Sequence, residues 1–249
     1  MQILKKIFSK SRSLDEDGIF FVAIEKIIGY KPTSILYFKS AFTHKSCNQV
    51  DDKGNPISYE RLEFLGDAML SSIIAAHLFN EVPSGDEGYL TKMRSKIVSR
   101  EHLNELGKDL NLLMLLKSKI ASQNFGDNIY GNVFEALVGA IYLDGGFEAC
   151  KKFIFQEVIK PYVDIPRLEG KVISYKSLLI EWCQKEKKIF NYDVFDDNSI
   201  TGERLFGVKL SIDDRVIAKA RATSKKKAEE KASQRAYFAL QEKMDRARR

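Results

Sequence analysis

Three carboxylates stand in an otherwise apolar stretch, YERLEFLGDAML, at residues 59–70. On a helix that turns about 100° per residue, Glu60, Glu63 and Asp67 fall within roughly 60° of one another and form one stripe. The neighbouring stripe, which includes Leu62, is apolar, so we expect Glu63 and Asp67 near the edge of a core. Like charges repel there unless a cation or a proton intervenes. This pattern therefore indicates a partner for the acids.

A second pair of oxygen-bearing side chains lies in GNVFEALVGAIYLDGG, residues 131–146. Asn132 and Glu135 are three residues apart and thus share a helix face, while the other positions are apolar enough to bury most of this helix. If the two helices face each other, oxygen ligands from both surround a hard divalent ion such as Mg²⁺. Such an ion takes a few carboxylates together with water and substrate phosphate. The combination predicts phosphoryl-transfer chemistry.

An ordinary ion-pair network is the alternative interpretation of the acids, because such networks are common in proteins. The basic side chains that could take part in it are Arg61, Arg94, Lys96 and Arg100.

The elements that position these acids are predicted to be helices, because apolar residues upstream of residue 165 recur at helical spacing. The segments with this spacing are 20–30, 35–46, 64–82, 85–110 and 128–163. Either Ser84 or Asp86 is expected to cap the fourth segment, and Gly145 and Gly146 are expected to break the last one into two helices. The first domain is therefore predicted to be all-helical.

The pattern changes farther along the chain. A helical segment at 175–188 is followed by three segments with strand-like alternation and by a final helix, at 191–197, 203–213, 215–223 and 224–244. This order, α-β-β-β-α, predicts a second domain with a small sheet. The fold class of the whole chain is thus predicted to be α+β.

Length and composition suit one or two globular domains, with 249 residues of which 44% are hydrophobic. The net charge of +6 is unevenly distributed: residues 171–249 hold 19 Lys and Arg against 12 Asp and Glu, a net +7, and the rest of the chain is at −1. We expect an N-terminal extension at 1–18, a first domain at 19–165, a linker at 166–172 and a basic domain at 173–243. A basic excess of this kind is typical of nucleic-acid binding.

The remaining composition argues for a protein of the cytoplasm. The cysteines and histidines show no zinc-ligand spacing, and we expect the three cysteines, Cys47, Cys150 and Cys183, to be reduced. The sequence has no apolar run of the kind found in signal peptides or membrane spans, so no membrane partner is expected.

The segment ERLEFLGDA, residues 60–68, resembles the signature of the ribonuclease III family. The resemblance extends through FTHKS at 42–46, DEGYLTKMRSKIVSRE at 86–101 and FEALVGAIYLD at 134–144, and it covers about residues 20–243. It implies a helical endonuclease domain that forms a symmetric homodimer, followed by a double-stranded-RNA-binding domain. This agrees with the α-β-β-β-α order found above.

The resemblance also implies roles for individual residues. Glu63 and Glu135 would ligate a catalytic Mg²⁺, for which Mn²⁺ could substitute, and Asp67 would orient or activate the attacking water; Glu60 and Glu87 would be supporting acids. Two active sites in a dimer would cut both strands of double-stranded RNA with a stagger, leaving 5′-phosphate and 3′-hydroxyl ends, in the processing of ribosomal and messenger RNA precursors. No small-molecule cofactor is implied.

One position departs from the family pattern. Asn132 stands where an aspartate is usual, three residues before Glu135. An amide oxygen can ligate Mg²⁺ but carries no negative charge, so affinity for the ion should fall. Two hypotheses follow: an active endoribonuclease with a higher Mg²⁺ requirement, or a double-stranded-RNA-binding protein of the same fold that has lost cleavage.

RNA contacts are expected from the basic domain. Its last helix begins after Thr223 or Ser224 with three lysines whose charges, added to the helix dipole, favour phosphates, although a solvated helix end has the same composition. The resemblance to double-stranded-RNA-binding domains implies that the first helix faces a minor groove and the loop near residue 202 faces the next one. Such a placement suits duplex RNA, which is recognised mainly by shape. The predicted contact residues are Lys225, Lys226, Lys227, Lys176, Glu181, Gln184, Gly202 and Arg204.

Overall fold

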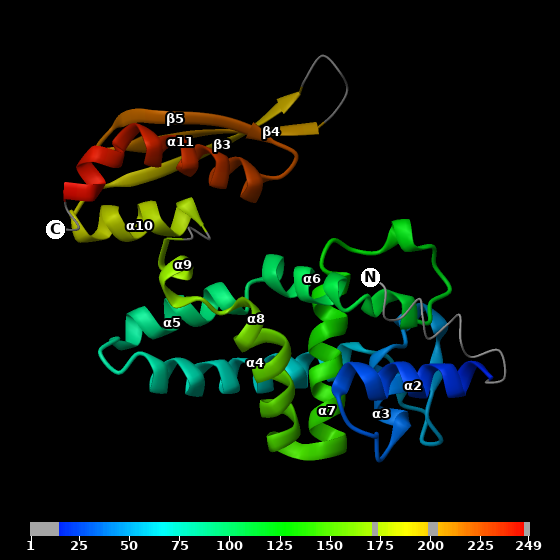
Figure 1. Ribbon diagram of the computed structural model, residues 1–249. Helices are drawn as coiled ribbons and strands as arrows, with labels where there is room; N and C mark the ends of the chain where they lie inside the picture. The colour runs from blue at the N-terminus through cyan, green and yellow to red at the C-terminus, as the bar shows by residue number, and fades with distance from the viewer. Residues whose placement is uncertain (1–14, 171–173, 199–203, 247–249) are drawn as a thin grey trace. The chain divides into compact units, whose positions relative to one another are not determined.

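The computed structural model describes residues 15–170, 174–198 and 204–246, which form helices and strands of the predicted α+β class (Figure 1). The chain divides into two compact units between residues 171 and 172. The predicted loop contact at Gly202 and most of the predicted N-terminal extension lie outside the described residues.

The first unit is helical, as predicted. Its α-helices are α2 (Glu16–Ile28), α3 (Ile35–Ala41), α4 (Glu60–Glu81), α5 (Glu87–Ile97), α6 (Arg100–Asp109), α7 (Ile129–Ile154), α8 (Lys160–Tyr162) and α9 (Ile165–Gly170). Short turns of 3-10 or π helix join them, at η1 (Lys45–Cys47), η2 (Leu112–Leu115), η3 (Ser122–Asn124) and η4 (Phe155–Ile159). A two-stranded antiparallel ribbon, β1 (Gln49–Val50) and β2 (Pro56–Ile57), was not predicted, because two-residue strands are too short to show alternation.

Local signals in the sequence define the helix ends. Asp86 caps α5 by accepting a hydrogen bond from the Tyr89 amide at 2.7 Å, which decides between the two predicted caps. Ser99 caps α6, so the predicted helix at 85–110 is two helices. The predicted break in the last long helix is confirmed at Gly146, whose φ of 75° and ψ of −169° are not helical.

Helices α4 and α7 cross at the centre of this unit (Figure 1). Two glycines face the partner helix at the crossing: a side chain at Gly66 would collide with the carbonyl of Glu135, and one at Gly139 with the carbonyl of Leu62. Both backbones therefore approach more closely than any residue with a Cβ atom permits. Apolar residues complete the core on either side, among them the fully buried Leu70.

Helix α4 also has the length and mean hydropathy of a membrane span, with an 18-residue window at 1.4. No such segment was expected from the sequence. In the structure α4 packs against α7 and carries buried residues of the core, such as Ile74 and Leu78. Its central position in this unit therefore accounts for the apolar residues that are buried, which make up 33% of that window.

A short helix, α9, occupies much of the region for which a linker was predicted at 166–172. Lys96 of α5 is 4% exposed, and its ammonium donates hydrogen bonds to the carbonyls of Leu168 and Glu169 at 2.5 and 3.0 Å. The Tyr89 hydroxyl donates to the Glu169 carboxylate at 2.7 Å. The C-terminal carbonyls of α9 are therefore satisfied by a cation, and these residues are folded onto α5.

The second unit has the predicted order α-β-β-β-α. Its elements are α10 (Tyr175–Lys185), β3 (Phe190–Asn198), β4 (Arg204–Ile212), β5 (Arg215–Ala222) and α11 (Lys225–Arg246). The strands form an antiparallel sheet in the order β3-β4-β5, in which Val208 pairs with Val194 on one side and with Ala220 on the other. Alternate residues of β4, such as Val208 and Leu210, are buried against both helices, which lie on the same face of the sheet (Figure 1).

Candidate active site and RNA-binding residues

The predicted acids of α4 and α7 lie around one open cavity of about 720 Å³ in the first unit. Glycine contacts between the two helices bring Glu63 and Asp67 to the same opening as Glu135. The residues that line the cavity are Lys45, Tyr59, Glu60, Glu63, Phe64, Asp67, Val98, Arg100, Leu103, Asn128, Gly131, Asn132 and Glu135. Five predicted site residues are thus brought together from two helices.

Glu87, the other predicted supporting acid, does not line this cavity in the single chain. It is the first residue of α5, and its carboxylate accepts a hydrogen bond from the Thr91 hydroxyl at 3.1 Å. Val98 and Arg100, which follow the other end of α5, reach the cavity instead. An 11-residue helix is about 16 Å long, so Glu87 lies at the far end.

Glu135 is the acid whose ionisation is most strongly opposed. Burial, together with the smaller effects of the negative charges of Asp67 and Glu63, raises the pKa of Glu135 to about 8, against an opposing effect of Arg100. Without a cation in the cavity, Glu135 is therefore largely protonated at neutral pH. An added positive charge would favour its ionised form.

Ionisation of Glu63 is opposed by the same effects. Burial raises the pKa of Glu63, as do the charges of Glu60 and Asp67, while Arg100 lowers it. Within the described part of the chain, no hydrogen bond or ion pair engages the carboxylates of Glu63, Asp67 or Glu135. The acids therefore face a cavity with little compensation for their charge.

Among the acids of the cavity, only Glu60 at its exposed edge forms an ion pair with a basic residue in the part of the chain that the structure describes. Lys45, at 3.0 Å from Glu60, forms an ion pair that leaves both side chains exposed to solvent. Lys96, one of the candidates for an ordinary network, instead binds the end of α9. Arg100 acts on Glu63 and Glu135 only through its field. The structure thus gives weak support to the interpretation of the acids as an ordinary ion-pair network.

The donor set fits a hard cation that needs few protein ligands. Among the residues that the structure describes, no three His, Cys, Asp or Glu side chains are grouped as a complete metal site. Mg²⁺ does not require such a cage, because it usually retains waters and binds one or two carboxylates together with substrate phosphate. Under-compensated carboxylates beside an open cavity, with the amide of Asn132 among them, are the ligands that suit this ion.

Asn132 lies beside Glu135 in the cavity lining and interacts with the Tyr59 hydroxyl. Burial raises the pKa of Tyr59, the charge of Glu63 raises it further, and the hydrogen bond from Asn132 lowers it. The position that departs from the usual aspartate is therefore in contact with the site and not remote from it.

The predicted phosphate-binding lysines lie at the start of α11. Ser224 is the residue that caps this helix, because its hydroxyl accepts a hydrogen bond from the Lys227 amide at 3.3 Å. Lys225, Lys226 and Lys227 are all exposed, and the Lys225 ammonium lies 5.8 Å from the centre of the Phe206 ring. The first turn of α11 thus presents three cations and the positive end of the helix dipole to solvent.

The predicted residues of α10 differ in their surroundings. Glu181 and Gln184 are exposed, as groove contacts must be. The Lys176 ammonium instead forms an ion pair with Glu229 of α11 at 2.6 Å and lies 4.9 Å from the centre of the Tyr192 ring. Arg204 begins β4, and its side chain is not among those described.

Sequence reasoning missed several residues that build the cavity. Lys45, Tyr59, Asn128 and the two crossing glycines were not proposed as parts of the site. An isolated glycine within an apolar helical pattern is a signal of close backbone approach, and it was present in both helices. Lys45 begins η1 and lies in the segment FTHKS, but neither its residue type nor its spacing marked it as part of the site.

The sequence is similar to known proteins along most of its length. Residues 36–162 match a family described as Ribonuclease-III-like, and residues 175–240 match the Double-stranded RNA binding motif. The chain is 68% identical to Ribonuclease 3 of Flavobacterium psychrophilum over 98% of its length and 99% of that protein. It is 63% identical to Ribonuclease 3 of Zunongwangia profunda, over 98% of its length and all of that protein. A crystal structure of the nuclease domain of ribonuclease III from Campylobacter jejuni is 30% identical, covers 58% of this chain and 97% of that one, and has a TM-score of 0.49.

Proposed function

The chain belongs to the ribonuclease III family, and we propose that it is a Mg²⁺-dependent endoribonuclease that cuts both strands of double-stranded RNA. The observation that carries the proposal is the convergence of Glu63, Asp67 and Glu135 on one open cavity, where no ion pair among the described residues engages their carboxylates. A second, basic unit with the double-stranded RNA binding motif supports the choice of a duplex substrate.

Glu63, Glu135 and Asn132 are the residues proposed to hold Mg²⁺. Bound there, Mg²⁺ would polarise the scissile phosphate and offset the charge that develops on the leaving oxygen. Glu135 must release its proton to act as a ligand, and its pKa of about 8 makes this release depend on pH. Ion binding is therefore expected to weaken as the pH falls below that value.

Asp67 is proposed to accept a hydrogen bond from the attacking water and to orient it. This carboxylate is exposed in the cavity mouth, one helical turn beyond Glu63, where solvent and substrate both have access. Glu60, held at the rim by Lys45, keeps the cavity negative without entering the reaction. The products of this hydrolysis would carry 5′-phosphate and 3′-hydroxyl ends.

We propose that two chains associate through a surface beside the cavity. Phe64, the residue after Glu63, is 82% exposed and lies at the cavity edge. Solvation of a large apolar side chain is unfavourable, and such exposed residues are typical of interfaces. A two-fold axis near Phe64 would place two acidic cavities on one duplex, and a staggered cut in both strands would follow.

The cellular role belongs to the same proposal. Processing of ribosomal and messenger RNA precursors would supply the structured duplexes that such an enzyme cuts. The three cysteines are buried and unpaired, which supports a reducing compartment such as the cytoplasm.

The test is cleavage of a labelled perfect RNA duplex across a Mg²⁺ titration, with Mn²⁺ in a parallel series. Glu135→Gln is the loss-of-function variant. Its matched control is Glu148→Gln, at an exposed glutamate that follows the break at Gly146 and lies outside the cavity. We expect staggered, metal-dependent cuts with the wild type and the control, and none with Glu135→Gln. Duplex binding is measured in parallel, with Ca²⁺ in place of Mg²⁺, to test the alternative of a binding protein that has lost cleavage. Binding without cuts at any Mg²⁺ concentration would support this alternative, in which Asn132 has replaced a required charge.

A further inference from the structure

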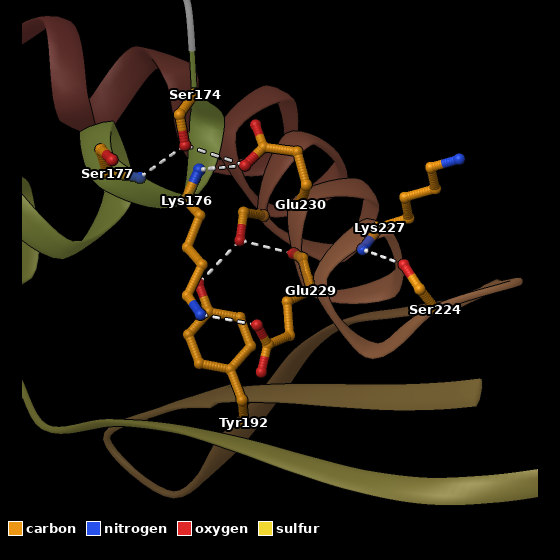
Figure 2. Close-up of polar contacts among 9 residues, drawn as sticks. Ser174, Lys176, Ser177, Tyr192, Ser224, Lys227, Glu229 and Glu230 are labelled. Atoms are coloured by element: carbon orange, nitrogen blue, oxygen red, sulfur yellow. Dashed lines mark hydrogen bonds and ion pairs between the residues drawn. The ribbon is translucent and has the colours of Figure 1, made fainter. Parts of the chain in front are cut away.

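In the second unit, a carboxylate of α11 caps the start of α10 (Figure 2). Glu230 accepts hydrogen bonds from the Tyr175 amide at 2.5 Å, from the Ser174 hydroxyl at 2.8 Å and from the Lys176 amide at 3.4 Å. Ser174 in turn accepts from the Ser177 amide at 3.2 Å. The first backbone N–H groups of a helix have no intrahelical partner, and negative charge is favourable beside them. Glu230 thus joins the two helices through the backbone of α10.

The neighbouring glutamate makes a second connection between the same helices. The Glu229 carboxylate pairs with the Lys176 ammonium at 2.6 Å, and both groups are shielded, with side chains 20% and 33% exposed. The Tyr192 hydroxyl is 2.7 Å from the Ser233 hydroxyl, which donates to the Glu229 carbonyl at 2.7 Å. Figure 2 shows these contacts converging between α10, β3 and α11. Lys176 is consequently held within the unit and not extended toward solvent.

These connections lie close to the exposed lysines. Glu230 is three residues after Lys227, about 4.5 Å along the helix axis, and therefore within the turn that follows the proposed phosphate-binding turn. A carboxylate so near to phosphate-binding cations repels RNA and, by charge alone, weakens binding. The presence of Glu230 here is explained if RNA affinity gains more from a fixed orientation of α10 relative to these lysines than it loses through the added repulsion.

We propose that Glu230 is a positioning residue for duplex binding, which fixes the start of α10 relative to the lysines of α11 so that both helices meet one duplex at a set spacing. The inference rests on the proposed function, since it requires double-stranded RNA as the ligand. Recognition of duplex RNA by shape depends on such a spacing, because a minor groove and the phosphates across the adjacent major groove must be contacted together. Glu230 touches no RNA in this arrangement and acts only through α10.

The experiment measures binding of the full chain to a perfect duplex in Ca²⁺ at a series of salt concentrations. Glu230→Ala removes the cap, and Glu230→Gln removes the charge but keeps one oxygen acceptor. Glu186→Ala is the matched control, because it removes the same charge from an exposed position at the other end of α10. We expect about a tenfold loss of affinity for Glu230→Ala, a smaller loss for Glu230→Gln, and unchanged or tighter binding for the control.

The salt dependence separates positioning from simple loss of folded protein. Misplaced lysines make fewer phosphate contacts, so the slope of log K against log salt becomes shallower, by about one for each lost contact. A partly unfolded population lowers the apparent affinity but leaves the slope of the folded fraction unchanged. In Mg²⁺, KM for duplex cleavage should rise for Glu230→Ala while kcat is retained, because the cavity of the first unit is not altered.

Three outcomes would overturn the inference. Glu230→Ala that binds as tightly as Glu186→Ala, or more tightly, would show that only charge matters. Weaker binding with an unchanged salt slope would assign Glu230 a purely structural role. If the wild type fails to bind the duplex at all, the proposed function fails with it, whereas wild-type binding with unaltered variants refutes the positioning role alone.

Discussion

Gly66 of α4 lies directly against the carbonyl oxygen of Glu135 in α7, with no room for a side chain between the two backbones. The contact lies between Glu63 and Asp67 in sequence, so the same crossing that closes the core also brings the acids of the two helices to one cavity. Site geometry and core packing are therefore determined by the same residues.

Gly66→Ala is expected to force the helices apart, because the added methyl group would overlap backbone that cannot give way as a flexible side chain does. The free energy of unfolding should fall by about 2–3 kcal/mol, and cleavage should fall at least tenfold in the protein that remains folded. Chemical denaturation and duplex cleavage measure the two effects. Gly126→Ala is the control, since a Cβ there meets nothing within 4 Å. If both variants have the same free energy of unfolding and the same cleavage rate, the tight contact between α4 and α7 is refuted.

Asn132→Asp is expected to retain cleavage and to lower the Mg²⁺ concentration required for half-maximal rate. An aspartate restores a charged oxygen ligand beside Glu135, which strengthens attraction for the cation. A Mg²⁺ titration of duplex cleavage measures the change, with Asn128→Asp at a second amide of the cavity lining as the comparison. An unchanged or higher requirement in Asn132→Asp would count against a role for this position in ion binding.

Glu135→Gln is expected to stabilise the metal-free protein at alkaline pH. The folded pKa of Glu135, about 8, exceeds its ordinary value of 4.5, so the folded state holds this proton more tightly than the unfolded state. Wild-type stability contributed by this group is therefore present below pH 4.5 and is lost as the pH rises toward 8. Glutamine cannot ionise, so the variant does not lose this stability. At pH 8 its free energy of unfolding should exceed that of the wild type by roughly 1–2 kcal/mol, after allowance for partial solvation.

Denaturation in EDTA at pH 5 and pH 8 measures the effect, and the advantage of Glu135→Gln should be found at pH 8 only. Added Mg²⁺ should then stabilise the wild type more than the variant, since binding to the folded state raises stability. An advantage that is the same at both pH values would indicate a packing effect and not the relief of a buried charge.

Phe64→Ser is expected to shift the proposed dimer to monomer, because it removes the apolar side chain that is 82% exposed beside the cavity. Analytical ultracentrifugation measures the association. Phe79→Ser is the matched control, an aromatic residue of the same helix that is 69% exposed and 15 residues away. Retention of the dimer in Phe64→Ser, or its loss in the control variant, would place the interface elsewhere.

Local features of the structure were predictable from the sequence. The acidic stripe of Glu60, Glu63 and Asp67 follows from helical periodicity, and the cap at Asp86 and the break at Gly146 follow from the chemistry of single residues. The α-β-β-β-α order of the second unit was also predicted, because alternation and helical spacing differ within a few residues. Each of these properties depends on neighbours in the chain.

Features that depend on contacts between distant segments were not predictable in the same way. Glu87, predicted as a supporting acid, lies at the far end of α5 in the single chain, and Lys176, predicted as an RNA contact, forms an ion pair with Glu229. The predicted linker at 166–172 contains most of α9, which Lys96 holds, and the boundary between the two units falls inside it. For Lys96 and Lys176, a partner remote in sequence determines where the side chain lies.

The sequence by itself thus determined which residues could do chemistry and on which helices they lie, because residue type and periodicity are local. Only the tertiary structure decided that Glu135 is buried enough to hold a proton near neutral pH, and that two glycines allow α4 and α7 to bring their acids together. Desolvation and repulsion between carboxylates depend on distances through space, which the crossing of two helices sets and the order of residues alone does not.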